Sequence, residues 1–94
     1  MASKIKVERN ADDARLEELG VRKWPIWTKE ASEFPWRYDE AEVCYILEGE
    51  IEVTPDGDEP VRIGPGDLVT FPKGMGCRWK VTKPVRKHYT WWER

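Results

Sequence analysis

Histidine is scarce in this sequence, because His88 is the single histidine among 94 residues. A metal centre that holds a transition ion through three imidazoles therefore cannot form within one chain. Cysteine is scarce as well, with Cys44 and Cys77 alone. Two widely spaced cysteines fit neither a disulfide scaffold nor a zinc knuckle. We therefore expect two reduced thiols and a cytoplasmic protein.

Long apolar runs and an excess of one charge are also missing. The apolar runs are only a few residues long, too short to cross a membrane, and no signal peptide is evident at the N-terminus. The formal net charge is −2 and both signs are interspersed, so there is no basic stripe for nucleic acid. We expect neither a membrane nor a nucleic acid as a partner.

Aromatic residues, by contrast, are abundant. They make up 12% of the chain and include six tryptophans, and 36% of the residues are charged. Large aromatic side chains fill cores and line ligand pockets. The length suits one domain, covering residues 1–94, and the composition favours a folded barrel with a cavity.

Short runs of alternating apolar and polar residues, separated by turn signals, predict an all-β sandwich or barrel. One short N-terminal helix is expected over Ala11–Leu19, with Asn10 as its cap and Gly20 as its end. A strand with a proline near its middle is expected over Val21–Thr28.

The clearest strand signal covers Glu42–Leu47, in which Glu42, Cys44 and Ile46 share one face. A separate strand is expected over Glu50–Thr54. A turn at Lys83-Pro84 should lead into a last strand, Val85–Trp92.

Two motifs stand out by their spacing. Glu42 and Gly49 are separated by six residues, and five residues separate Gly66 from Pro72-Lys73-Gly74. This pattern resembles the two signature motifs of the cupin superfamily, which implies a double-stranded β-helix, also called a jelly-roll barrel. The motif histidines are replaced here by Trp36, Tyr38 and Cys77.

A more specific pattern runs through most of the chain: Lys23-Trp24-Pro25-Ile26-Trp27, Phe34, Trp36, Tyr38, Glu42, Cys44-Tyr45-Ile46-Leu47-Glu48-Gly49, Gly66 to Gly74, Cys77-Arg78-Trp79 and Pro84 to Tyr89. By these residues, the chain most resembles, within the cupins, small single-domain members of the ureidoglycine aminohydrolase-like family. The named activity of that family implies a metal, usually manganese, held by histidine and glutamate, and this sequence departs from the pattern at those ligands.

We therefore expect no native metal. Tryptophan is a donor only and cannot ligate, and tyrosine ligates well only as a phenolate. The best alternative set for a divalent ion such as Zn²⁺ or Mn²⁺ is Glu42 and Cys77 with Tyr38 or His88.

Glu42 and Cys77 are the candidate catalytic residues. Glu42 could be an acid or base whose pKa burial raises, or a structural carboxylate hydrogen-bonded to Tyr38 or a Trp indole. Cys77 could be a reactive thiol or a small apolar filler, and for Cys44 we favour the filler.

A ligand could stack on an aromatic cage of Trp36, Tyr38 and Trp79. Our leading hypothesis is a cupin that binds a small molecule without a metal. Two alternatives are an enzyme of the ureidoglycine aminohydrolase-like or lyase type, and a homodimeric structural module with a filled barrel. The predicted ligand-binding residues are Trp36, Tyr38, Glu42, Cys44, Cys77 and Trp79.

An apolar outer face predicts a partner. If Glu42 faces inward, then Val43, Tyr45 and Leu47 face outward, where an isolated barrel should be polar. The N-terminal segment or a second subunit must cover them, and we predict a homodimer. Other candidates for its surface are Trp24, Trp27, Trp91 and Trp92.

Overall fold

The computed structural model describes residues 5–91, which form an all-β barrel with one short α-helix. Both features agree with the prediction from sequence. The elements in chain order are β1 (Lys6–Glu8), α1 (Asp13–Leu19), the 3₁₀ turn η1 (Val21–Lys23), β2 (Ile26–Lys29), β3 (Ser32–Arg37), β4 (Glu42–Pro55), β5 (Val61–Ile63), β6 (Leu68–Phe71) and β7 (Gly76–Trp91).

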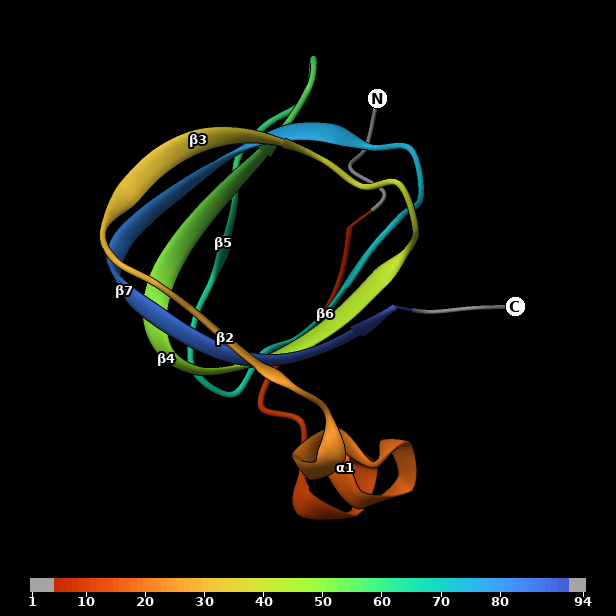
Figure 1. Ribbon diagram of the computed structural model, residues 1–94. Helices are drawn as coiled ribbons and strands as arrows, with labels where there is room; N and C mark the ends of the chain where they lie inside the picture. The colour runs from red at the N-terminus through yellow and green to blue at the C-terminus, as the bar shows by residue number, and fades with distance from the viewer. Residues whose placement is uncertain (1–4, 92–94) are drawn as a thin grey trace.

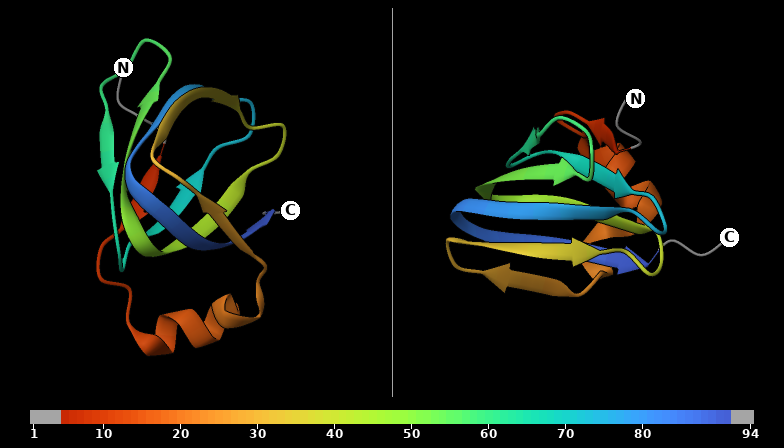
Figure 2. Two further views of the ribbon diagram at one scale, coloured as in Figure 1. Left: turned by 60° about the vertical axis from the view of Figure 1, so that its left-hand side comes forward. Right: turned by 90° about the horizontal axis from the view of Figure 1, so that it is seen from above.

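The strands form one antiparallel sheet that curls into a jelly roll (Figures 1 and 2). Its order is β1-β6-β4-β7-β2, while β3 also pairs with β7 and β5 with β4. The two long strands pair along almost their whole length, from Glu42 opposite Trp91 to Pro55 opposite Cys77. β4 and β7 each pair with three other strands, and together they contribute most of the buried residues of the barrel core.

The long strands differ from the prediction, which divided each of them into two. β4 continues through Gly49, and β7 continues through Lys83 and Pro84 without a turn. The β4–β7 register shifts at three points between Ile46 and Ile51, so the irregularity is absorbed within the ladder. Pro84 lies where that ladder is irregular, and its missing N–H therefore does not end the strand.

The N-terminal helix begins later than predicted. Asp12, not Asn10, is its cap: the Asp12 side chain accepts a hydrogen bond of 2.9 Å from the Arg15 backbone N–H. Gly20 ends the helix as expected, in the left-handed conformation at φ 71°. The predicted strand over Val21–Thr28 is wrong in its first half, which forms η1.

Two apolar clusters lie on opposite faces of the sheet. The larger one fills the barrel and includes Cys44 and Ile46. The smaller one joins Leu16 and Val21 to Val43 and Leu68 on the outside, with Tyr45 packed against it. Figure 1 shows α1 lying outside the barrel wall. The N-terminal segment therefore covers the outer face of β4 at Val43 and Tyr45.

This cover removes the reason for a second subunit at Val43 and Tyr45, because α1 and η1 shield them. Leu47, the third outward residue, is half-buried and lies outside that cluster. The homodimer stays a prediction. Trp91 is 48% exposed, and Trp92 lies outside the described residues. Within residues 5–91, no helix combines the length and the apolar character that a membrane crossing requires.

Candidate ligand-binding site

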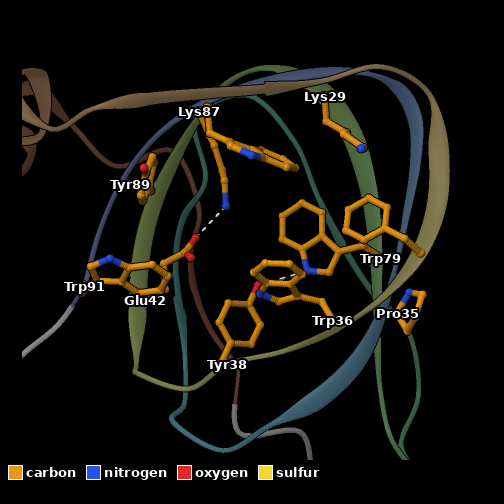
Figure 3. A pocket seen from close by; sticks show the side chains of 11 residues that line it. Lys29, Pro35, Trp36, Tyr38, Glu42, Trp79, Lys87, Tyr89 and Trp91 are labelled. Atoms are coloured by element: carbon orange, nitrogen blue, oxygen red, sulfur yellow. Dashed lines mark hydrogen bonds and ion pairs between the residues drawn. The ribbon is translucent and has the colours of Figure 1, made fainter.

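A cavity of about 540 Å³ opens among β2, β3, β4 and β7 (Figure 3). This volume is typical of small-molecule sites. The hypothesis of a filled barrel required that no cavity lie beside Glu42, and the structure contradicts it. The lining residues are Trp27, Lys29, Phe34, Pro35, Trp36, Tyr38, Glu42, Trp79, Lys87, Tyr89 and Trp91.

A buried ion pair lies in this cavity. Lys87 Nζ donates to Glu42 Oε2 at 2.6 Å, and each side chain is only 6% exposed. Glu42 begins β4, and Lys87 comes from β7, opposite Ile46. A charged group is rarely buried unless it is paired, because desolvation costs several kcal/mol for each ion. The pair therefore keeps both charges at an otherwise aromatic site.

Aromatic rings surround the Lys87 ammonium. Nζ lies 4.8 Å from the Trp79 ring centroid, 5.0 Å from that of Trp27 and 5.9 Å from that of Tyr89. The negative faces of the rings attract the cation, and desolvation strengthens the attraction. Glu42 and the three rings together stabilise the positive charge of the Lys87 ammonium.

The sequence analysis did not identify Lys87. A signal was present, because Val85, Lys87 and Tyr89 alternate along β7 and so share one face. Val85 packs in the core cluster and Tyr89 packs against it. A lysine between two inward apolar residues indicates a buried cation.

Tyr38 closes another side of the cavity. Its ring stacks on Phe71 at a centroid distance of 4.8 Å, and its hydroxyl accepts a hydrogen bond of 3.0 Å from Trp79 Nε1. Burial, and then the nearby Glu42 charge, raise the pKa of Tyr38 far above its usual range. Tyr38 is therefore a neutral phenol that can donate a hydrogen bond.

Four of the predicted site residues come together here: Trp36, Tyr38, Glu42 and Trp79. Cys44 and Cys77 are not among the lining residues, and both pack in the core cluster. Burial raises the pKa of Cys44 to about 12. Burial, and then Asp56, raise that of Cys77 to about 11. His88 is also outside the lining, and its Nδ1 lies 2.9 Å from the Trp24 carbonyl oxygen.

These positions predict that both thiols are unreactive in the folded protein. A rise in the Cys77 pKa from 9.0 to about 11 lowers its thiolate fraction at neutral pH about 100-fold. We expect Ellman's reagent to label neither cysteine readily at pH 7 and to label both in guanidinium. Fast labelling of native protein that disappears in Cys77→Ser would contradict the buried position of Cys77.

The cavity does not fit a metal of the usual cupin kind. Among the described residues, no group of three or more His, Cys, Asp or Glu side chains could hold an ion. The Lys87 ammonium already occupies one oxygen of Glu42 and would repel a divalent cation. The alternative set of Glu42, Cys77 and Tyr38 fails as well. Cys77 does not line the cavity, and Tyr38 is held as a phenol.

The jelly roll and the motif glutamate that lines its cavity are the features expected of a cupin. Within that superfamily, the chain belongs to the EutQ-like cupin domain family, whose model matches residues 16–89. The cupin resemblance is thereby confirmed, whereas the narrower resemblance to the ureidoglycine aminohydrolase-like family stays a prediction.

Similar structures support this membership. A DUF861 family protein from Thermotoga maritima is 56% identical and has a TM-score of 0.91, over 95% of this chain and 100% of that one. A putative ethanolamine utilization protein Q from Salmonella typhimurium LT2 is 28% identical with a TM-score of 0.65, over 71% of this chain and 54% of the other.

A curated relative is larger. The acetate kinase EutQ of Escherichia coli K12 is 30% identical over 81 residues, which are 86% of this chain. That match covers 32% of the relative, so this chain corresponds to about a third of the longer protein.

Proposed function

We propose that this protein binds a small organic molecule in the Lys87 pocket, meaning the cavity lined by Lys87, Glu42 and the aromatic residues described above, and that binding needs no metal. The observation that carries the proposal is the buried Glu42–Lys87 pair inside an open aromatic cavity. The family resemblance implies a metal cation beside the motif glutamate. Here the Lys87 ammonium lies beside it, 2.6 Å from Oε2.

The walls favour a flat ligand. Trp36 and Trp91 line the cavity yet remain 47% and 48% exposed. Exposed aromatic faces are stabilised when another ring or a planar ligand covers them. Aromatic pairs prefer an offset-stacked arrangement. A planar ligand would remove part of this apolar surface from water and contact the ion pair at the same time.

An enzyme of the ureidoglycine aminohydrolase-like or lyase type, with Glu42 and Cys77 as its working groups, is the weaker proposal. Cys77 is separated from the cavity lining and is held as a thiol. Kinase activity is named for a relative about three times longer. The part of that relative beyond the match could hold residues that the activity needs.

Metal content and binding test the proposal together. We expect purified protein to carry no stoichiometric transition metal by elemental analysis. We also expect planar heteroaromatic compounds to raise the melting temperature by the same amount before and after dialysis against EDTA, since a ligand stabilises the state that it binds. Trp36→Ala should reduce the shift. A stoichiometric metal, or a shift lost on chelation, would overturn the proposal.

Two further proposals concern the cellular location and the oligomeric state of the protein. Cys44 and Cys77 are both free thiols, which supports a cytoplasmic location. Ile26, Trp36 and Trp91 are exposed large apolar residues, which supports a homodimer. Trp36 and Trp91 also line the Lys87 pocket, so an interface that included them would border that pocket. Light scattering of the purified chain would test the second of these.

A further inference from the structure

The ion pair leaves polar atoms unused. Glu42 Oε2 accepts from Lys87, and Oε1 takes no hydrogen bond from any described residue. Among the described residues, no fully buried side-chain nitrogen or oxygen lacks a hydrogen-bond partner. Glu42 itself lines the cavity, so with respect to the described residues Oε1 is the carboxylate oxygen left for a ligand. Figure 3 shows the Glu42 and Lys87 side chains extending toward each other inside the pocket.

Lys87 also keeps donors. An ammonium carries three N–H groups, and one of them is directed to Glu42. Among the described residues, only the faces of aromatic rings lie next to the remaining N–H groups. With respect to residues 5–91, an acceptor on Glu42 without a partner and donors on Lys87 that face only aromatic rings thus lie next to each other, because the two side chains are in direct contact.

The charge of the pair limits what can bind to it. Glu42 and Lys87 neutralise each other, so a ligand group that contacts both should be neutral. A charged group would leave an unpaired charge in a desolvated site. A carboxylate would also approach the open Oε1, and like charges repel. Lys29 is the remaining charged residue of the lining, and it is exposed above the Phe34 ring at 5.3 Å.

We infer that the Lys87 pocket recognises a planar compound with a neutral amide edge, meaning a primary amide or lactam whose N–H and C=O lie side by side. The amide oxygen accepts from Lys87, and the amide N–H donates to Glu42 Oε1. The attached ring stacks against the tryptophans of the wall. This inference rests on the proposed function and assigns a ligand class to it.

The strength of these contacts sets the expected selectivity. Hydrogen bonds that involve a charged group are roughly twice as strong as those between neutral groups. An analogue without the N–H leaves a carboxylate oxygen unpaired, and such a loss corresponds to at least about a tenfold drop in affinity. An analogue with a negative charge should lose at least as much.

Three probes with one ring test the inference: benzamide, N,N-dimethylbenzamide and benzoate. Isothermal titration of the full chain should show benzamide binding at least about tenfold more tightly than either of the others. Glu42→Gln should reduce the ratio of the benzamide affinity to the benzoate affinity, because the substitution removes the negative charge that repels benzoate. Trp36→Ala should weaken benzamide and benzoate alike and leave their ratio unchanged.

Three other binding results would overturn the inference. Tighter binding of benzoate would identify an anion site and overturn the inference. Equal binding of all three probes would show that stacking alone selects the ligand, and would also overturn it. No binding of any probe at millimolar concentration would reject the amide class, whereas the proposed function is judged separately by metal content and by the heteroaromatic screen.

Discussion

Lys87→Met should lower the free energy of unfolding by about 3–5 kcal/mol, the usual cost of removing one partner of a buried ion pair. The variant leaves the Glu42 carboxylate, 6% exposed, without the ammonium that contacts it at 2.6 Å. Small domains are stable by only about 5–15 kcal/mol, so the loss is a large share of the total. Urea unfolding followed by tryptophan fluorescence measures it.

The matched control removes both charges. Glu42→Gln combined with Lys87→Met should recover much of the loss, because replacing a whole buried pair by uncharged groups is often close to neutral. The single change Glu42→Gln should cost less than Lys87→Met, since the rings of Trp27 and Trp79 still hold the ammonium. If the two single losses simply add in the double variant, the charges are not coupled.

Gly49→Ala should destabilise the fold by about 3 kcal/mol or more, the sum of backbone strain and overpacking. Gly49 has φ of 106°, and an added Cβ would lie 2.5 Å from the Pro84 carbonyl oxygen and 2.7 Å from Val85 Cα. Both obstacles are backbone atoms of β7, so relief requires a displacement of the central strand pair. Chemical unfolding, or the soluble yield if the variant does not fold, measures the effect.

Gly57→Ala is the control for this change. Gly57 also has a positive φ, 73°, but nothing lies within 4 Å of its added Cβ. Strain at that position should cost about 1–2 kcal/mol, because the left-handed conformation alone is penalised. Equal losses in the two variants would show that the close approach of β7 to Gly49 is unimportant.

The alternating strands predicted an all-β barrel from local, periodic signals, and the resemblance of the two spaced motifs to those of cupins narrowed it to the cupin fold. Gly49 shows why the motif spacing is informative: β4 and β7 approach so closely there that a side chain does not fit. The alternation of Glu42, Cys44 and Ile46 also predicted the inward face of β4, and the core cluster confirms it for Cys44 and Ile46. Successive side chains of a strand point to opposite faces of the sheet, so the position of one residue determines which face its neighbours occupy.

The site could be predicted only in part. Lysine is almost never fully buried, so a lysine in a charged segment gives little reason to expect a ligand pocket. The expected turn at Lys83-Pro84 also interrupted the alternation that would have placed Lys87 inside. Cys77 was expected in the pocket because it replaces a motif histidine. Its shorter side chain packs in the core instead, and Trp79 and Tyr38 form the wall.

The cover of β4 could not be decided from the strand pattern. Val43 and Tyr45 were correctly expected to face outward, but a helix or a second subunit would satisfy that pattern equally. Whether a helix or a second subunit covers these residues depends on the path of the chain from α1 through η1 to β2. That path is part of the tertiary structure and is not encoded in the strand pattern. Leu16 and Val21 make the contact in the structure.

The long pairing of β4 with β7 also has a kinetic consequence. Glu42 lies opposite Trp91 and Cys44 opposite Tyr89, so the main ladder joins segments that are far apart along the chain. Closing such large loops costs entropy before the contacts are gained, and β proteins of this kind fold in about milliseconds to seconds. Until that ladder closes, Glu42 and Lys87 remain separately hydrated, so a compound that requires both can bind only after the β4–β7 ladder has formed.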